Sequence, residues 1–266
     1  MHKHLFSILG IIFALTVGGC GGSGGDSPPA PAPAAQEPID PNLTIPVQTA
    51  YANFVNTGLD QPFTISGWID ESTGVNPRPP TPITGSGRLT IGAGVAGTFT
   101  GGPFDGSAVF RVTEVTTGTI VTNGQSTPIG STGQVYFYAN NYTTLVTDFP
   151  GEYTVYDAHT YPETVKAGDT GFVRNGRQYQ SFVDSLKPEG PFPHPILITV
   201  AYAVLSDSAT TLLVRFIEDS NDSILGHLGQ TQTVYRIDTV GNVSPVSVTT
   251  LKYFLGSVYQ TIAFTF

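Results

Sequence analysis

The stretch FVRNGRQYQSFVD, residues 172–184, gives the clearest indication of the fold class. Asn175-Gly176 is the dipeptide most typical of a type I′ turn, whose two central residues both adopt positive φ. Runs rich in residues that favour strands flank it, at 172–174 and at 177–184. The pattern predicts a β-hairpin centred on Asn175-Gly176.

Similar runs, separated by Gly- and Pro-rich turns, extend through the chain on both sides. No sustained 3.6-residue periodicity follows Ala50. Asn123-Gly124 predicts a second hairpin, and further turns are expected at 219–222 and 239–242. Proline-rich loops are expected at 76–82 and 186–195. The expected strands lie at 62–71, 88–92, 96–100, 108–115, 134–148, 152–158, 196–206, 211–218, 231–238, 242–251 and 253–266.

The composition agrees with an all-β protein. Gly (31) and Pro (21) supply turns, while 12 Tyr and 16 Phe can build a core. We therefore predict an all-β fold of antiparallel β-sandwich type, in two β domains at 48–149 and 150–266 with a break at Pro150. A faint repeat, with offsets of 125 and 123 residues, agrees with two such domains.

The N-terminus has the pattern of an export signal. One Lys and two His precede a 13-residue, almost entirely apolar run at 5–17, too short to span a membrane but typical of a signal-peptide core. Val17-Gly18-Gly19-Cys20 follows, and this motif resembles the lipid-attachment site of bacterial lipoproteins. The resemblance implies a signal peptide at 1–19 and a mature N-terminal Cys20 that carries diacylglycerol and an N-acyl chain such as palmitate. Gly21 in place of Asp then implies transfer to the outer membrane.

A Gly/Pro/Ala-rich linker follows Cys20. Residues 20–47 begin with a flexible Gly/Ser segment and continue as a stiffer proline-rich run. We expect a tether between membrane and folded region. The Gly25-Asp26-Ser27 triplet within it has nothing to hold a catalytic base beside its serine.

Charge and cysteine content restrict the partners. The formal net charge is −9, and Lys3 is the only Lys or Arg before Cys20, so the mature chain would carry −10. Nucleic acid is excluded as a partner, because phosphate binding needs a basic surface. Since Cys20 is the sole cysteine, the folded region contains no disulfide and no cysteine nucleophile.

No residue pattern predicts a catalytic, metal or cofactor site. His159, His194 and His227 lack metal-ligand spacing, and no G-x-S-x-G motif is present. Asp70 and Glu71 are sequence neighbours that would point to opposite faces of a strand, so they cannot act as a glycosidase pair. The oxygens at 219–222 lack the spacing of a calcium loop, and we interpret them as a polar turn.

Exposed aromatic residues are the remaining candidates for binding. Trp68, Tyr136, Tyr138 and Tyr142 would suit a carbohydrate or protein ligand if they lie on the surface. Tyr136 and Tyr138 share one face of a strand, which is also compatible with core packing.

These patterns predict a lipoprotein of the outer membrane, facing the periplasm or the cell surface, whose tethered β-sandwich is a binding or structural module. Two alternatives stay open. One is an anchored hydrolase that acts on envelope or extracellular polymer. The other is an outer-membrane β-barrel, which the alternating apolar residues and terminal Phe of 262–266 resemble.

Overall fold

The computed structural model describes residues 40–70, 79–187, 195–254 and 257–266. The predicted signal peptide, Cys20 and most of the linker lie outside these residues, as do Glu71, His194 and parts of both predicted proline-rich loops. In the first half the elements are β1 (Thr44–Pro46), α1 (Val47–Thr57), β2 (Leu59–Ile69), β3 (Thr81–Ile91), β4 (Val95–Thr98), the 3₁₀ turn η1 (Gly102–Phe104), β5 (Ala108–Thr122), β6 (Gln125–Tyr138) and β7 (Thr144–Phe149). In the second half they are β8 (Glu152–Tyr156), β9 (Thr164–Lys166), β10 (Thr170–Tyr179), α2 (Phe182–Ser185), β11 (Ile196–Ser206), β12 (Thr211–Asp222), β13 (Gly226–Asp238), β14 (Val243–Phe254) and β15 (Ser257–Thr265).

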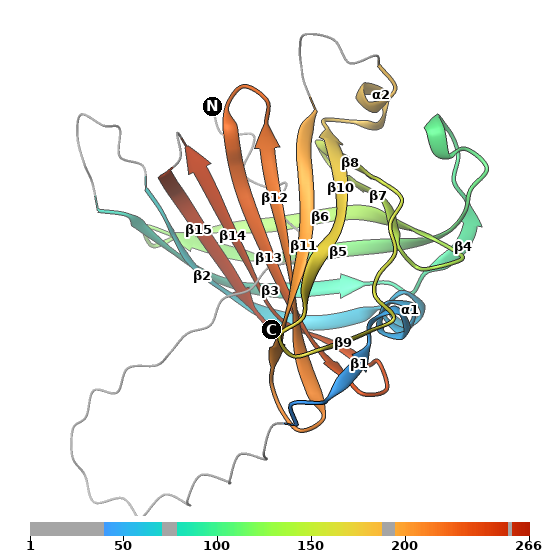
Figure 1. Ribbon diagram of the computed structural model, residues 1–266. Helices are drawn as coiled ribbons and strands as arrows, with labels where there is room; N and C mark the ends of the chain where they lie inside the picture. Colours follow the sequence, from blue (N-terminus) through green and yellow to red (C-terminus); the bar gives the residue numbers. More distant parts are fainter. Residues whose placement is uncertain (1–39, 71–78, 188–194, 255–256) are drawn as a thin grey trace, which may run out of the picture.

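One antiparallel sheet closes into a barrel. Its strand order is β3-β2-β15-β14-β13-β12-β11-β10-β8-β7-β6-β5-β4, and β3 also pairs with β5 from Ile83↔Thr122 to Ile91↔Glu114. Twelve strands thus form a closed ring, with β4 as a short extra strand on β5. In Figure 1 the orange and red strands β12 to β15 cross in front of the cyan and green strands β2, β3, β5 and β6.

The predicted sandwich of two β domains is therefore wrong, although the all-β class is confirmed. The strands of both predicted domains form one ring without a gap, because β15 pairs with β2 and β7 pairs with β8. Pro150-Gly151 forms only the tight turn between β7 and β8. Local strand patterns are the same in sandwiches and barrels, so they could not show that β3 and β5 would pair.

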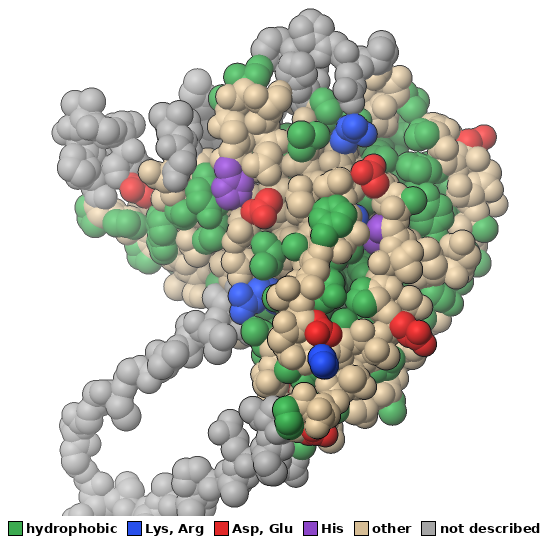
Figure 2. Space-filling model, viewed as in Figure 1, with side chains coloured by type: hydrophobic (Ala, Val, Ile, Leu, Met, Phe, Trp, Pro, Cys, Tyr) green, Lys and Arg blue, Asp and Glu red, His purple; other side chains and the backbone are tan. Residues whose placement is uncertain are grey.

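On strands such as β2 the inner face is apolar and the outer face is polar. Along β2, Phe63 and Ile65 face inward and are buried, whereas Thr64 and Ser66, which alternate with them, are exposed. Most of the buried side chains in the lumen come from two clusters, one around Phe216 and Tyr235 and one around Phe63 and Phe264. On the face shown in Figure 2, the green hydrophobic side chains of the described residues lie in separate patches among polar ones.

Helix α1 was not predicted, and it covers one end of the barrel beside β1 and β9 (Figure 1). Its residues Val47, Ala50 and Val55 are buried against the strands. The helix ends at Gly58, whose φ is +71° and whose N–H donates to the carbonyl of Phe54 at 2.9 Å. Within the described ranges, neither helix has the length and apolar character that a membrane span requires.

The two Asn-Gly dipeptides have different structures. Asn123 and Gly124 have φ of 53° and 75° and form the predicted turn between β5 and β6. Asn175-Gly176 is not a turn, and the predicted hairpin there is wrong: β10 continues through both residues and pairs with β8 and β11. A Cβ on Gly176 would lie 2.8 Å from the ring of Tyr156, so this glycine permits close packing inside the barrel.

Two strand boundaries also differ from the prediction. The predicted strand at 134–148 is divided into β6 and β7 by a turn at Asn141, whose side chain accepts hydrogen bonds from the backbone N–H and the hydroxyl of Thr143. The predicted turn at 219–222 is the end of β12 instead. There Asp222 Oδ1 accepts from the backbone N–H groups of Ile224 and Leu225, which places the turn three residues later.

Candidate functional site

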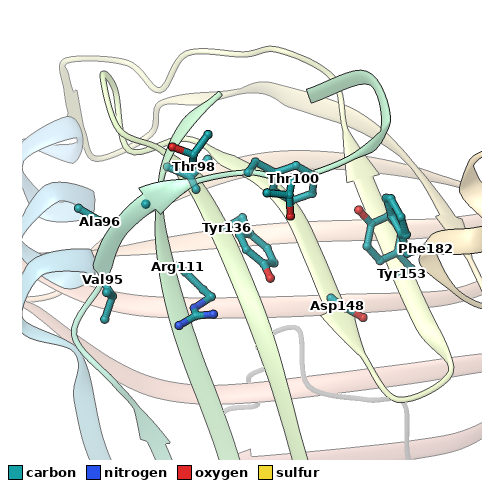
Figure 3. Close-up of a pocket in the computed structure, with 12 residues that line it drawn as sticks. Val95, Ala96, Thr98, Thr100, Arg111, Tyr136, Asp148, Tyr153 and Phe182 are labelled. Atoms are coloured by element: carbon teal, nitrogen blue, oxygen red, sulfur yellow. The ribbon is translucent and has the colours of Figure 1, made fainter. Parts of the chain in front are cut away.

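A hollow of about 540 Å³ lies on the outer face of the barrel, between strands β5 to β8 on one side and β4 with the segment that follows it on the other. Figure 3 shows its floor and its rim. The residues that line it are Val95, Ala96, Gly97, Thr98, Phe99, Thr100, Val109, Arg111, Tyr136, Asp148, Tyr153 and Phe182. Its volume is within the range of small-molecule sites.

Four neighbouring strands each place one polar side chain in this hollow. Arg111 of β5 pairs directly with Tyr136 of β6, and Asp148 of β7 pairs with Tyr153 of β8. Tyr136 pairs with Val146, two residues before Asp148 on the same strand, so both side chains emerge from the outer face. The result is a row Arg–Tyr–Asp–Tyr that crosses the sheet (Figure 3).

Aromatic rings form the side wall. Phe99 is buried and meets Tyr136 edge-on, with ring centroids 5.0 Å apart. Phe182 meets Tyr153 in the same manner at 5.5 Å. Such edge-to-face pairs hold ring orientations, so the phenol groups of the row are fixed in direction.

Local hydrogen bonds hold the two segments that carry these rings. The loop after Phe99 is closed by Asp105, whose Oδ1 accepts from the N–H of Gly101 at 2.6 Å. The short helix α2 begins at Ser181, whose hydroxyl oxygen accepts from the N–H of Asp184. These bonds position Phe99 and Phe182 over the sheet.

Both charged side chains of the row lack a protein partner. Within the described residues, neither Arg111 nor Asp148 makes a hydrogen bond or an ion pair within 4.0 Å. Desolvation raises the pKa of Asp148, and burial together with the Asp148 charge raises the pKa of Tyr136. Burial also raises the pKa of Tyr153. The row therefore presents one guanidinium, one carboxyl group and two phenol hydroxyls to a ligand.

Of the four aromatic candidates from the sequence, only Tyr136 lines the hollow. Tyr138 is on the same outer face, edge-on to Phe104 with centroids 6.5 Å apart. Trp68 is on the outer face of β2, opposite Thr261 and Pro82. Tyr142 stacks on Phe110 at 5.3 Å and packs against a core cluster.

The other residues of the row were not predicted. Arg111, Asp148 and Tyr153 are single polar or aromatic residues with no motif around them. They converge because the strands that carry them are joined by short turns, so a correct register for β5 to β8 would have brought them together. That register depends on the division of 134–148 into two strands, which the sequence pattern did not indicate.

Neither histidine that the structure describes forms a catalytic pair with a serine. The imidazole Nδ1 of His159 lies 2.9 Å from the carbonyl of Asp157, and its Nε2 lies 3.3 Å from Arg174. Burial, followed by the Arg174 charge, lowers the pKa of His159 to about 4. His227 lies against the ring of Tyr253. Among the described residues, no group of three or more His, Cys, Asp or Glu side chains is placed to hold a metal ion.

Comparisons with known proteins give no relative. No family model matches the chain, and neither a curated protein nor a solved structure matches it significantly. The function has to be inferred from the geometry of the molecule itself.

Proposed function

We propose that this protein is a membrane-tethered β-barrel that binds a carbohydrate in the outer hollow between β4 and strands β5 to β8. The observation that carries the proposal is the row of Arg111, Tyr136, Asp148 and Tyr153, whose two charged members have no protein partner among the described residues.

A sugar ring matches the chemistry of this row. Its hydroxyls both donate and accept, so they can pair with the carboxylate of Asp148 and the guanidinium of Arg111 at once. Its C–H faces pack on aromatic rings, which Tyr136, Tyr153 and Phe182 supply. The open position on the outer wall would admit a segment of a long polymer.

The distribution of side chains along β3 favours attachment through a tether over insertion of this part of the barrel wall into lipid. A membrane barrel presents an apolar band outward and a polar lumen inward. Here the outward positions of β3 include Thr84, Ser86 and Arg88, while Ile83 and Leu89 face the lumen and are buried. Together with the lipoprotein-like motif at Cys20, this supports a barrel held at an outer-membrane surface in contact with water.

The hydrolase alternative has less support. Glycoside hydrolysis commonly requires two carboxyl groups that flank one bond. Asp148 is the single carboxyl among the residues that line the hollow. A binding role needs only the row as it stands.

A glycan array of envelope and extracellular polysaccharide fragments tests the proposal, with the purified chain as the probe. We expect saturable binding to at least one glycan class, and a loss of 10-fold or more in affinity for Arg111→Gln and for Asp148→Asn. Both side chains are exposed and form no hydrogen bond with the residues that the structure describes, so neither change should disturb the fold.

Trp68→Ala is the matched control. It removes an aromatic side chain from the outer face of β2, away from the hollow. Equal losses for Trp68→Ala and Arg111→Gln would indicate a general effect on the barrel and contradict the assignment of the hollow. Absence of any glycan binding by the wild-type protein would refute a carbohydrate ligand.

A further inference from the structure

A belt of mostly polar residues crosses five neighbouring strands, β10 to β14, on the lumen side of the barrel wall. Register places Arg174 of β10 opposite Val200 of β11, and Val200 opposite Glu218 of β12. Glu218 is opposite Thr231 of β13, which is opposite Thr250 of β14. These residues face inward, in line with the buried apolar residues of the same strands. The belt is thus separate from the outer hollow, on the other side of the wall.

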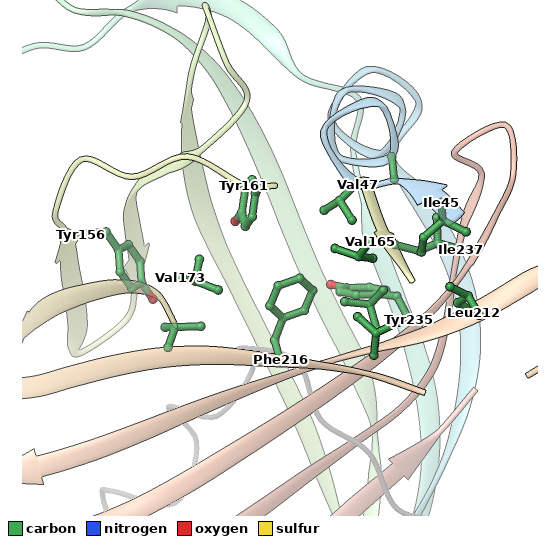
Figure 4. Close-up of a cluster of buried hydrophobic side chains, with 14 of the residues drawn as sticks. Ile45, Val47, Tyr156, Tyr161, Val165, Val173, Leu212, Phe216, Tyr235 and Ile237 are labelled. Carbon is green, nitrogen blue, oxygen red and sulfur yellow. The ribbon is translucent and has the colours of Figure 1, made fainter. Parts of the chain in front are cut away.

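A β-bulge turns Arg174 into the lumen. The pairing of β10 with β11 shifts between Phe172 and Arg174, which leaves Val173 as the extra residue. Val173 belongs to the buried cluster of the lumen, and the guanidinium of Arg174 lies 4.1 Å from the ring centroid of Tyr156. Figure 4 shows Tyr156, Tyr161 and Phe216 pointing into the same region.

Among the described residues, the hydrogen bonds of this guanidinium with normal geometry are all made by Nη1, and the Tyr156 hydroxyl also interacts with the guanidinium. Nη1 lies 2.8 Å from the hydroxyl of Tyr161, and 3.3 Å from both Thr144 Oγ1 and His159 Nε2. Nε is buried and has no hydrogen-bond partner among the described residues, and none of the hydrogen bonds described for Arg174 uses Nη2. A buried donor without a partner destabilises the protein, so an acceptor placed at this nitrogen would be favourable.

The nearby carboxyl group of Glu218 does not pair with the guanidinium of Arg174. Arg174 makes no ion pair within 4.0 Å with the described residues. The hydroxyl of Tyr156 instead donates to Glu218 Oε2 at 3.3 Å, so Glu218 already has a partner. One level further along the lumen, Lys252 adds a second inward cation between Gly229 and Gln260.

We propose that this belt is a second binding site, which takes a small molecule through a carboxylate on the Nε–Nη2 edge of Arg174. The planar edge formed by these two nitrogens matches the two oxygens of a carboxylate. Arg174 keeps part of its surface accessible, although its Nε is buried. The Tyr and Phe rings around it exclude competing water and strengthen the pair.

Calorimetric titration of the purified full chain with sodium acetate and with sodium octanoate tests the site. We expect saturable binding of at least one of these carboxylates to the wild type, weakened 10-fold or more in Arg174→Lys. Lysine keeps the charge but lacks the planar two-donor edge. Tighter binding of octanoate than acetate would show that the site also accepts an apolar chain, and equal binding would show recognition of the carboxylate alone; both support the proposal.

Arg177→Gln is the matched control, because Arg177 is on the same strand but on the outer face, paired with Leu197. Its affinity should equal that of the wild type. If Arg174→Lys does not fold by circular dichroism, the arginine Nε–H resonances of the wild type provide the readout. Acetate must then shift one Nε–H resonance of the wild type, and the same resonance must still be present in the spectra of Arg111→Gln and of Arg177→Gln. No binding of either acid at millimolar concentrations, or equal binding by a folded Arg174→Lys, would refute the site.

Discussion

At the scale of single residues, the same dipeptide has two different roles in this barrel. Asn123-Gly124 forms a turn because it lies between Thr122 and Gln125, which pair directly at the ends of β5 and β6, and both of its residues adopt positive φ. Asn175-Gly176 lies between two neighbouring strands that already pair with it. The hydrogen bonds of both neighbours favour an extended conformation over the local turn preference. Propensity alone therefore identified one turn correctly and one wrongly.

Burial of Glu114 predicts a pH-dependent stability. This inward carboxyl of β5 is 6% exposed, and burial raises its pKa from 4.5 to about 8. The folded state then binds a proton that the unfolded state has lost between these pH values, so stability falls as pH rises through this interval. The loss approaches about 1.4 kcal/mol per pH unit within the interval. Urea unfolding from pH 5 to pH 9 measures it.

Glu114→Gln should remove most of this decline, since the amide does not titrate. Asp60→Asn is the control, because the hydrogen bond from Arg88 holds the pKa of that exposed carboxyl below 3.8, outside the interval. Glu152, whose pKa is raised to about 7 by burial and then by the charge of Glu218, should leave a smaller decline in the variant. An unchanged slope in Glu114→Gln would contradict the buried state of this residue.

At the scale of elements, α1 shows how a short pattern was missed. The side chains that face the barrel, Val47, Ala50, Tyr51, Phe54 and Val55, have the i, i+3, i+4, i+7, i+8 spacing of an amphipathic helix. Gly58 follows as a helix-ending residue. The pattern is only 11 residues long and directly follows a proline-rich linker. The predicted boundary between linker and first domain, at 47/48, therefore lies within the helix.

Packing of α1 should contribute to the stability of the whole barrel. Val55 is fully buried, and its carbonyl accepts from the N–H of Gly94 at 2.7 Å, which joins the helix to the segment between β3 and β4. We expect Val55→Ala to lower the free energy of unfolding by about 2–3 kcal/mol. Asn56→Ala, an exposed change on the next residue, should stay within about 0.5 kcal/mol. Equal effects, measured by urea unfolding, would show that α1 does not pack on the barrel in solution.

At the scale of the whole molecule, closure joins the two ends of the folded chain. The C-terminal strand β15 pairs with β2 from Gln260↔Ile69 to Thr265↔Thr64. Neither half of the chain can close a ring alone, because each would leave two unpaired strand edges. This is the physical difference between the predicted pair of domains and the observed barrel.

A single barrel should unfold in a single step. We expect coincident urea transitions by tyrosine fluorescence and by far-UV circular dichroism for the full chain. Separate fragments 40–149 and 150–266 should aggregate or remain unfolded. Any strand structure should return only when the two fragments are mixed. Two resolved transitions, or two fragments that each fold cooperatively, would contradict one closed unit and restore the two-domain interpretation.

The amino-acid sequence by itself determined the strand content, most strand positions and the Asn123-Gly124 turn, because alternation and turn chemistry act over a few residues. It also predicted the lipoprotein-like N-terminus, and it selected Tyr136 as a binding candidate. Only the tertiary structure decided that the sheet closes, that Arg111, Asp148 and Tyr153 join Tyr136 in one hollow, and that Arg174 faces the lumen. These features depend on strand register and on the β3–β5 pairing, where the partners are 31 residues or more apart in several pairs, such as Gly87↔Gly118. Such contacts are set by the burial of one shared core, which no local pattern describes.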